Sequence, residues 1–197
     1  MTSQAVVGID LDDVLALTNE ALARFHNSKY GTAYTSDQVT SWETSFKTIW
    51  GVSDEEKARR IDEFLYSEEH MRMLPMPGAK DVIQKLGERY KLVIITARTR
   101  TAEHETRKWI GQHFPALADE IFFADAKDYS TKQSKEALCR TLGVNVLVDD
   151  AAHQMDRVAP CVSIALLFNR PWNRSFEPQA KNVRRVHTWE DIQRILL

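Results

Sequence analysis

Two aspartates, Asp10 and Asp12, follow a short apolar run near the start of the chain. Val6, Val7 and Ile9 are typical of a buried strand, and open α/β sheets bind ligands beyond the carboxyl ends of their strands. Two carboxylates at this spacing suit a hard cation such as Mg²⁺, and one of them then remains for nucleophilic or acid–base chemistry. An Asp-x-Asp after a strand is also common as a turn or helix cap. Polar residues at the ends of the later strands would favour the metal site over the turn or cap.

Two further strands are predicted to end in polar groups. Thr96 follows the apolar run 92–95, and Asp149 and Asp150 follow the run 144–148. Parallel strands bring their carboxyl ends to one edge of a sheet, so these side chains and the first aspartates are expected to meet. Lys135 lies near the start of the preceding helix, where backbone N–H groups already favour an anion. The set predicts a site with carboxylates for a metal and with a hydroxyl and an ammonium for phosphate oxygens.

Alternation of strands and helices after residue 77 predicts an α/β fold, with a parallel sheet and helices on both faces. Strands are expected at 6–9, 92–96, 121–123, 144–148 and 162–168. Helices are expected at about 79–86, 101–113, 134–142 and 189–196.

A helical insertion is predicted between the first strand and this regular part. A helix is expected from Thr18 to Lys29, and a second from Ser53, which opens a capping box with Glu56, to about residue 66. Residues 18–76 are therefore assigned to a small helical cap, and residues 1–17 and 77–197 to the core. Aromatic side chains are concentrated between the two helices, and Trp42 is the candidate substrate contact among them.

The composition is that of an ordinary globular protein of 197 residues, with 43% apolar and 27% charged residues. A net charge of −2 gives no broad basic surface for duplex nucleic acid or an anionic membrane. Cys139 and Cys161 are the only cysteines and lack metal-binding spacing, which favours a reducing compartment. The chain begins without a signal-peptide pattern, so a cytoplasmic location is expected.

Four motifs in order resemble those of the haloacid dehalogenase superfamily. They are DLDDV at 10–14, IITAR at 94–98, Lys135, and VLVDD at 146–150. The resemblance implies a Rossmann-like fold of that superfamily with a helical cap inserted after the first strand. Within the superfamily the chain is most similar to the 5′(3′)-deoxyribonucleotidase-like group, on the short cap, the double Asp, and the tail segments LFNRPWNR at 167–174 and VRRVHTWEDI at 183–192.

This resemblance implies the roles of the acidic residues. Asp10 is expected to attack phosphorus and form an aspartyl-phosphate, while Asp12 protonates the leaving alcohol and then activates water. Mg²⁺ is expected to be held by Asp10, the backbone carbonyl of Asp12 and Asp150. Asp149 is expected as a further ligand or as a residue that orients the ligands. Asp13 stands where many relatives have glycine and adds a carboxylate of undefined role.

The resemblance also implies which groups bind the substrate. Thr96 and the backbone N–H of Ala97 are expected to bind phosphate oxygens, and Lys135 to neutralise charge in the ground and transition states. Arg98 is close enough in sequence to reach a phosphate or a base, but it is equally compatible with a solvated surface arginine. His153 is expected to be a helix-capping or surface residue.

These expectations lead to a Mg²⁺-dependent phosphomonoesterase that acts on a nucleotide. A phosphatase of another small phosphorylated metabolite is the nearest alternative. Two non-catalytic alternatives are a phospho-accepting receiver domain and a superfamily member that binds a nucleotide without turnover. The acidic pair after Lys135 and the helical insertion disfavour a receiver.

Overall fold

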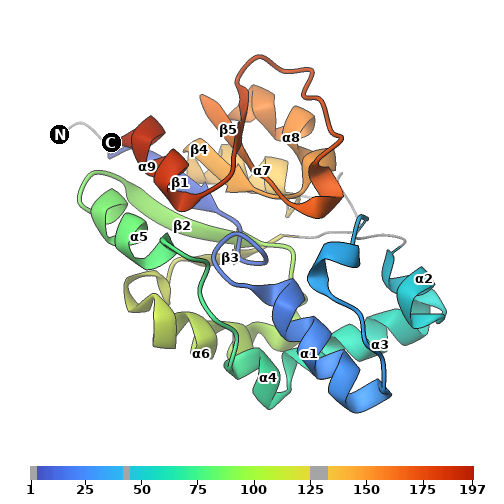
Figure 1. Cartoon of the computed structure of the whole chain (residues 1–197). Coiled ribbons are helices and arrows are strands. Elements are labelled where there is room, and N and C mark those ends of the chain that lie inside the picture. Colours follow the sequence, from blue (N-terminus) through green and yellow to red (C-terminus); the bar gives the residue numbers. More distant parts are fainter. Residues whose placement is uncertain (1–3, 42–44, 125–132) are drawn as a thin grey trace.

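A computed structural model describes residues 4–41, 45–124 and 133–197. These residues form a six-stranded, wholly parallel sheet in the order β3-β2-β1-β4-β5-β6, flanked by helices (Figure 1). The strands are β1 Val6–Ile9, β2 Lys91–Thr96, β3 Ile121–Phe123, β4 Val144–Asp149, β5 Ile164–Phe168 and β6 Val183–Val186. The predicted α/β fold with a parallel sheet is confirmed.

The strand order reverses direction beside β1. The chain runs outward from β1 to β2 and β3, then returns to the other side of β1 for β4, β5 and β6. Open α/β sheets form a crevice at such a reversal, beyond the carboxyl ends of the two strands concerned. Here those strands are β1 and β4, which are paired from Val6 to Ile9, and the pairing continues where Asp10 N–H donates to Val148 O at 2.9 Å.

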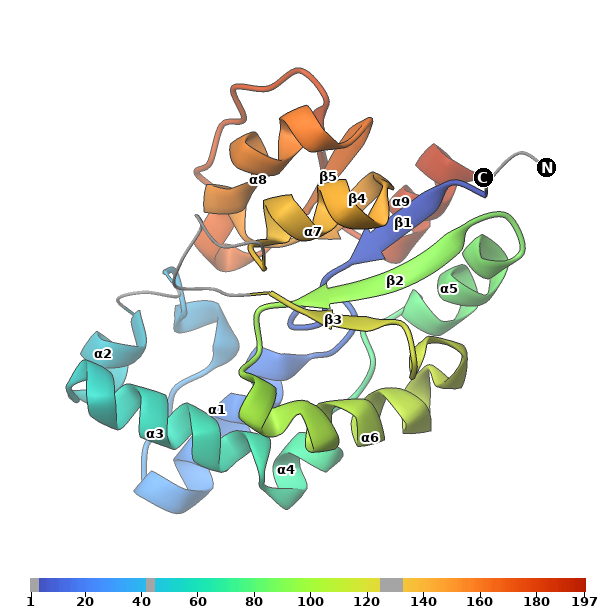
Figure 2. The same cartoon turned by 180° about the vertical axis from the view of Figure 1, so that it is seen from behind.

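Helices cover both faces of the sheet (Figures 1 and 2). One face packs against α5, α6 and α9, and the other against α7 and α8. Alternate residues of each strand serve the two layers, since Ile94 belongs to the first and Val93 and Ile95 to the second. The helices of these layers are α5 Ala79–Gly87, α6 Glu103–His113, α7 Lys135–Leu142, α8 Ala152–Val158 and α9 Trp189–Leu196.

The described part of residues 18–76 is helical, as predicted, and contains α1 Thr18–Tyr30, α2 Ser45–Trp50, α3 Asp54–Leu65 and α4 Glu68–Met71. Helix α1 ends at Gly31, whose φ of 66° lies in the left-handed region that glycine adopts without strain. The predicted cap at Ser53 is confirmed, because its side chain accepts a hydrogen bond from Glu56 N–H.

The two connections between this helical segment and the rest of the chain are hydrogen-bonded to each other. Leu17 N–H donates to Leu74 O at 2.9 Å, and Met76 N–H donates to Leu15 O at 2.7 Å. Close by, the indole of Trp109 in α6 donates to Met73 O at 3.0 Å. The connection that leaves β1 is therefore bonded to the one that leads to α5, and the latter is also bonded to α6.

Apart from short 3-10 helices, four described elements are absent from the sequence-based prediction: α2, α4, α8 and β6. The prediction of five strands is wrong, because the sheet has a sixth strand, β6, at one edge. Strand β6 has two arginines between its valines, and Arg185 turns inward to donate to Asn169, Asn173 and Phe176. The two arginines interrupt the apolar pattern that indicates a strand. Arg185 can still lie inside the protein because its N–H groups are hydrogen-bonded there.

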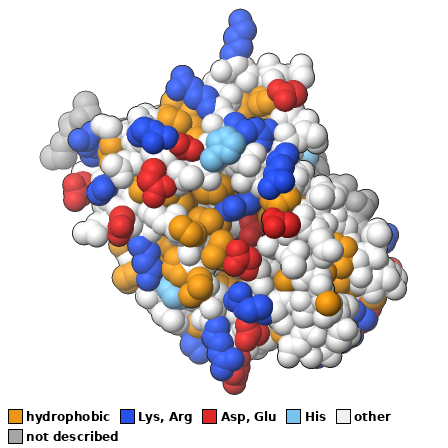
Figure 3. Space-filling view, viewed as in Figure 1, with side chains coloured by type: hydrophobic (Ala, Val, Ile, Leu, Met, Phe, Trp, Pro, Cys, Tyr) orange, Lys and Arg blue, Asp and Glu red, His pale blue; other side chains and the backbone are white. Residues whose placement is uncertain are grey.

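Charged side chains of both signs are mixed over the face shown in Figure 3. This agrees with the small net charge of −2. Among the described residues, no helix has the length and apolar character needed to cross a lipid bilayer.

Candidate active site

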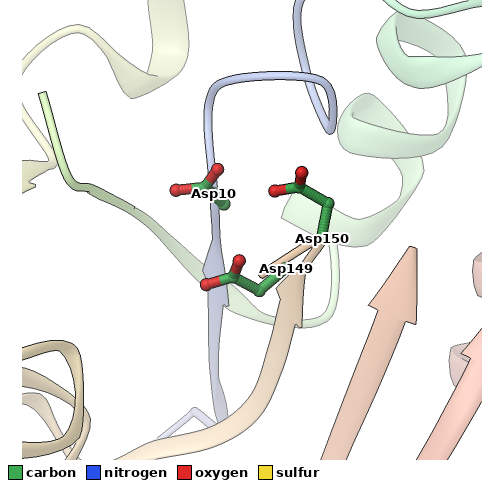
Figure 4. A group of neighbouring side chains, drawn as sticks. All are labelled: Asp10, Asp149 and Asp150. Atoms are coloured by element: carbon green, nitrogen blue, oxygen red, sulfur yellow. The ribbon is translucent and has the colours of Figure 1, made fainter. Parts of the chain in front are cut away.

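Three buried aspartates meet where β1 and β4 end (Figure 4). Asp10 directly follows β1, Asp149 is the last residue of β4, and Asp150 comes next. One carboxylate oxygen from each lies within 4.8 Å of the other two. Parallel pairing of neighbouring strands thus brings together residues about 140 positions apart, as the sequence predicted.

Lys135, the first residue of α7, lies against this group. Its Nζ donates to Asp10 Oδ1 and to Asp149 Oδ2, both at 2.6 Å. Ser134 places it there, because the Ser134 side chain accepts from Ala137 N–H and fixes the start of the helix. Burial alone would lower the pKa of Lys135, but the Asp10 and Asp149 carboxylates raise it above its usual value. The lysine is therefore a permanent cation in the site.

One lysine does not balance three carboxylates. Burial raises the pKa of Asp10 well above its usual value, Lys135 opposes that rise, and the neighbouring Asp149 and Asp150 add to it. The pKa of Asp150 is raised by burial and then by Asp149 and Asp13. A small divalent cation with a preference for oxygen ligands would relieve this repulsion. The donor set fits Mg²⁺ in charge and in ligand chemistry.

The segment after β5 holds Asp150 in place. The indole Nε1–H of Trp172 donates to Asp150 Oδ2 at 2.7 Å. The side-chain amide of Asn173, which is buried, donates to the backbone oxygens of Asp150 and Phe168, each at 2.8 Å. Side chains that hydrogen-bond to metal ligands fix ligand orientation. Both residues lie in LFNRPWNR, which the sequence analysis used only as a sign of resemblance.

Asp12 is bound by an arginine. Arg98 donates from Nη2 to Asp12 Oδ1 at 2.7 Å and from Nε to both carboxylate oxygens at 3.0 and 3.2 Å. Thr18, the first residue of α1, donates to Asp12 Oδ1 at 2.7 Å. Burial alone would raise the pKa of Asp12, but the charge and hydrogen bonds of Arg98 lower it overall. Arg98 is only 7% exposed, so the alternative of a solvated surface arginine is wrong.

The Asp13 side chain binds the start of helix α1. Its backbone has φ 56°, in the left-handed region, and its Oδ1 accepts from Asn19 N–H in the first turn of α1 at 3.1 Å. Oδ2 is buried without a hydrogen-bonding partner among the described residues. Burial raises the pKa of Asp13 to about 7. The requirement for positive φ explains why glycine also suits this position.

A cavity of about 380 Å³ opens over these groups. The carboxylate side is formed by Asp10, Asp12, Lys135 and Asp150. Opposite walls come from the helical segment and from the loops after β2 and β4, and include Thr18, Leu22, Lys57, Ile61, Phe64, Leu65, Ala97, Arg98, Thr99, Ala151 and Gln154. A larger cavity of about 650 Å³ lies beside the start of β2, between α5 and the end of α6. The chemistry-bearing carboxylates line only the smaller one.

The structure thus brings together nearly all the predicted site residues that it describes. Thr96 ends β2 fully buried, and its Oγ1 accepts from Arg98 N–H at 3.3 Å. Ala97 lines the cavity beside it. Trp42 lies outside the described residues. His153 is exposed on α8, as expected. Sequence reasoning missed Thr18, which lines the cavity and donates to Asp12. It also missed His70, which accepts from Arg98, and Trp172 and Asn173, which donate to Asp150.

Solved structures with this fold define the class of protein. A predicted phosphoglycolate phosphatase from Haemophilus somnus superposes with a TM-score of 0.70 at 15% identity, covering 100% of both chains. A haloacid dehalogenase-like hydrolase from Streptococcus pneumoniae gives a TM-score of 0.65 at 15% identity, again over 100% of both chains. The fold is therefore that of the haloacid dehalogenase-like hydrolases.

Sequence comparison then defines the family. The family "5′ nucleotidase, deoxy (Pyrimidine), cytosolic type C protein" matches residues 4–197. A protein of Oceanobacillus iheyensis described as "Putative nucleotidase" is 24% identical over 189 residues, which cover 94% of this chain and 95% of that protein. The chain belongs to this nucleotidase family, a family of phosphohydrolases, and has the fold of the haloacid dehalogenase-like hydrolases. The resemblance inferred from the four motifs is confirmed.

Proposed function

We propose that the protein is a Mg²⁺-dependent phosphomonoesterase that removes the phosphate of a nucleotide through an aspartyl-phosphate on Asp10. One observation carries this proposal: Asp10 lies buried between Lys135 and the Asp149–Asp150 pair, with Asp12 two residues away in the same cavity. In this proposal Asp10 is the nucleophile, Lys135 the permanent cation, the acidic group the metal site and Asp12 the second carboxylate around one space.

The metal would be held by the side chains of Asp10 and Asp150 and by the backbone carbonyl of Asp12, with Asp149 as a ligand or as a partner of Lys135. Mg²⁺ would supply positive charge that lowers the repulsion between the attacking carboxylate and the phosphate dianion. Family membership and the acidic group support this cofactor.

The protein groups account for the bonds that form and break. An Asp10 carboxylate oxygen attacks phosphorus, and the bond from phosphorus to the ester oxygen breaks. The departing oxygen takes a proton from Asp12. In the second step water attacks the phosphorus of the aspartyl-phosphate, gives a proton back to Asp12, and phosphate leaves. The proton that Asp12 gives to the leaving oxygen in the first step is returned to it by water in the second, so the cycle needs no other proton source.

Thr96, the Ala97 N–H group and Lys135 would bind the phosphate oxygens in this scheme. Thr96 ends β2, beside β1, Ala97 follows it, and Lys135 reaches Asp10 from α7. A hydrolase of the same fold from Deinococcus radiodurans contains bound phosphate and sodium, with a TM-score of 0.64 at 13% identity. This supports, at the level of fold, a phosphate beside a cation.

Residues 18–76 would act as the cap that selects the substrate, with residues 1–17 and 77–197 as the core. The apolar wall of Leu22, Ile61, Phe64 and Leu65 comes wholly from this segment and suits the flat face of a base. Lys57 and Gln154 add polar groups at the same cavity.

If the cap closes, ligand should alter hydrogen exchange at 14–17 and 76–78. Equal protection of these segments with and without ligand would count against cap motion.

The test is phosphate release from 5′- and 3′-nucleotides, deoxynucleotides and sugar phosphates, with Mg²⁺ or EDTA, for the native chain and Asp10→Asn. Release that needs Mg²⁺ and disappears in the variant supports the proposal. A preference for sugar phosphates would transfer it to another small phosphorylated metabolite. Nucleotide binding without any release would favour a non-catalytic role.

A cytoplasmic location also remains a prediction, in keeping with Cys139 and Cys161, which form no disulfide.

A further inference from the structure

Every N–H donor of Arg98 is directed at another protein group. Nε and Nη2 donate to Asp12, and Nη2 also lies 4.0 Å from Met73 Sδ. Nη1 donates to His70 Nε2 at 2.6 Å and to Thr106 Oγ1 at 3.2 Å. A guanidinium has five N–H groups, so none is left for a substrate in this arrangement. The expectation that Arg98 binds a phosphate or a base is thus replaced by a role inside the protein.

His70 forms the far end of this chain of contacts. It lies in α4, fully buried, with the edge of its ring against Phe64 at 5.8 Å between centroids. Arginine cannot accept a hydrogen bond, so His70 Nε2 must be the acceptor and the imidazole proton is on Nδ1. Burial and the charge of Arg98 lower the pKa of His70 to about 3, which keeps this tautomer neutral.

We infer that Arg98 and His70 are positioning residues for proton transfer: His70 orients the Arg98 guanidinium, and Arg98 fixes the carboxylate of Asp12 in the cavity. The inference deepens the proposed function and rests on it. It also links two parts of the chain, because His70 belongs to the helical segment while Arg98 follows β2. A displacement of α4 would move the proton-transfer group without touching the nucleophile.

The consequence can be measured through the leaving group. Loss of the ester oxygen of a nucleotide needs a proton, whereas p-nitrophenolate is stable enough to leave without one. A misplaced Asp12 should therefore harm nucleotide cleavage more than cleavage of p-nitrophenyl phosphate. The parameter kcat/KM reports the step that forms the aspartyl-phosphate, so its ratio between the two substrates isolates the acid. This ratio does not depend on the fraction of folded enzyme.

Two pairs of variants test the two contacts. Arg98→Lys keeps the charge but cannot bind both carboxylate oxygens and His70 at once. His70→Gln keeps an acceptor at the place of Nε2, whereas the amide of His70→Asn is too short to reach it. The ratio of kcat/KM for the best nucleotide to that for p-nitrophenyl phosphate is expected to fall at least about tenfold in Arg98→Lys and His70→Asn, a fraction of what general acids contribute. In His70→Gln the ratio should stay within about threefold of the native value, by the same principle.

An unchanged ratio in Arg98→Lys, with both activities retained or lowered in parallel, would overturn the role of Arg98. An equal fall in His70→Gln and His70→Asn would overturn the orienting contact at Nε2. If the native enzyme hydrolyses neither substrate, the proposed function fails, which is a different result from an active native enzyme whose ratio is insensitive to Arg98.

Discussion

Lys135 Nζ lies 2.6 Å from an oxygen of Asp10 and 2.6 Å from an oxygen of Asp149. All three side chains are at least nine-tenths buried, so neither carboxylate can regain full hydration when the lysine is removed. Breaking a buried charge pair by removing one partner is strongly destabilising because the other charge stays buried. The same lysine is therefore important for the fold and for the site.

Lys135→Met should lower the free energy of unfolding at pH 7 by about 3–5 kcal/mol. Urea denaturation measures this, and the loss should shrink toward pH 4 as the carboxylates become protonated. Lys91→Met is the matched control, since Lys91 pairs with Glu120 at 3.4 Å on the surface. That change should cost less than about 1 kcal/mol. Equal losses in the two variants would contradict the buried arrangement.

Trp172→Phe should weaken Mg²⁺ binding by about 10–100-fold, because Asp150 loses the indole that orients it. Isothermal titration of the protein with Mg²⁺ gives the affinity independently of activity. Trp189→Phe is the control, because the buried indole of Trp189, the first residue of α9, donates to Val14 O at 2.9 Å. The control should lose stability and keep its Mg²⁺ affinity. A Trp172→Phe protein with native affinity would show that Asp150 needs no such support, or is not a ligand.

Gly78 should not tolerate a side chain. Its φ of 78° is left-handed, and a Cβ would meet Glu190 Oε1 at 2.6 Å and Trp189 Cβ at 3.3 Å. The carboxylate end of Glu190 can move, but the backbone strain remains, at about 1–2 kcal/mol. Gly78→Ala should therefore lower the free energy of unfolding by that amount even in a Glu190→Ala background. Gly111→Ala should instead raise it by about 0.5–1 kcal/mol, because Gly111 lies inside α6 and a Cβ there would meet no atom within 4 Å apart from the backbone of its own helix. Thermal unfolding separates these opposite signs.

His26 should make the protein sensitive to acid. It is fully buried and stacks on Trp50 at 4.1 Å between centroids. Its Nε2 accepts from Arg60 Nη1 at 3.0 Å, so the neutral ring carries its proton on Nδ1, which donates to Thr32 Oγ1 at 2.8 Å. Burial and then Arg60 lower its pKa to about 4. The unfolded chain, with a histidine pKa of about 6.5, then binds the extra proton between these values. Stability is complete above about pH 6.5 and should fall toward pH 4 by at most about 1.4 kcal/mol per pH unit for this group.

His26→Gln should remove one proton from that pH dependence, while the contribution of His70 remains. The measurement is the free energy of unfolding in urea at intervals from pH 7 to pH 4, for the native chain and the variant. His187→Gln, at an exposed position, serves as the control and should keep the native slope. A native slope in His26→Gln would mean that His26 is not held neutral.

Much of this molecule follows from local sequence patterns. The run Val6–Ile9, the cap at Ser53 and the stop at Gly143 each depend on neighbouring residues, and each is found where predicted. The meeting of Asp10, Asp149 and Asp150 also follows, because parallel strands bring their carboxyl ends to one edge. Topology alone was enough to predict that much of the site.

What the sequence did not reveal depends on contacts between distant residues. The pairing of Arg98 with Asp12 joins residues 86 positions apart, and its contact with His70 spans 28 positions. No local pattern separates a buried, fully hydrogen-bonded arginine from an exposed one. Helices α4 and α8 escaped because each is seven residues or shorter, too short for a helical repeat to show.

The central claim is that Asp10 carries the phosphoryl group. The most direct measurement is acid quenching of a single turnover with phosphate-labelled nucleotide, followed by counting the label bound to protein. The native enzyme should retain label on a peptide that contains Asp10, the label should appear only with Mg²⁺, and Asp10→Asn should retain none. Label bound equally to Asp10→Asn, or rapid turnover of the native enzyme with no protein-bound label at any quench time, would contradict this account.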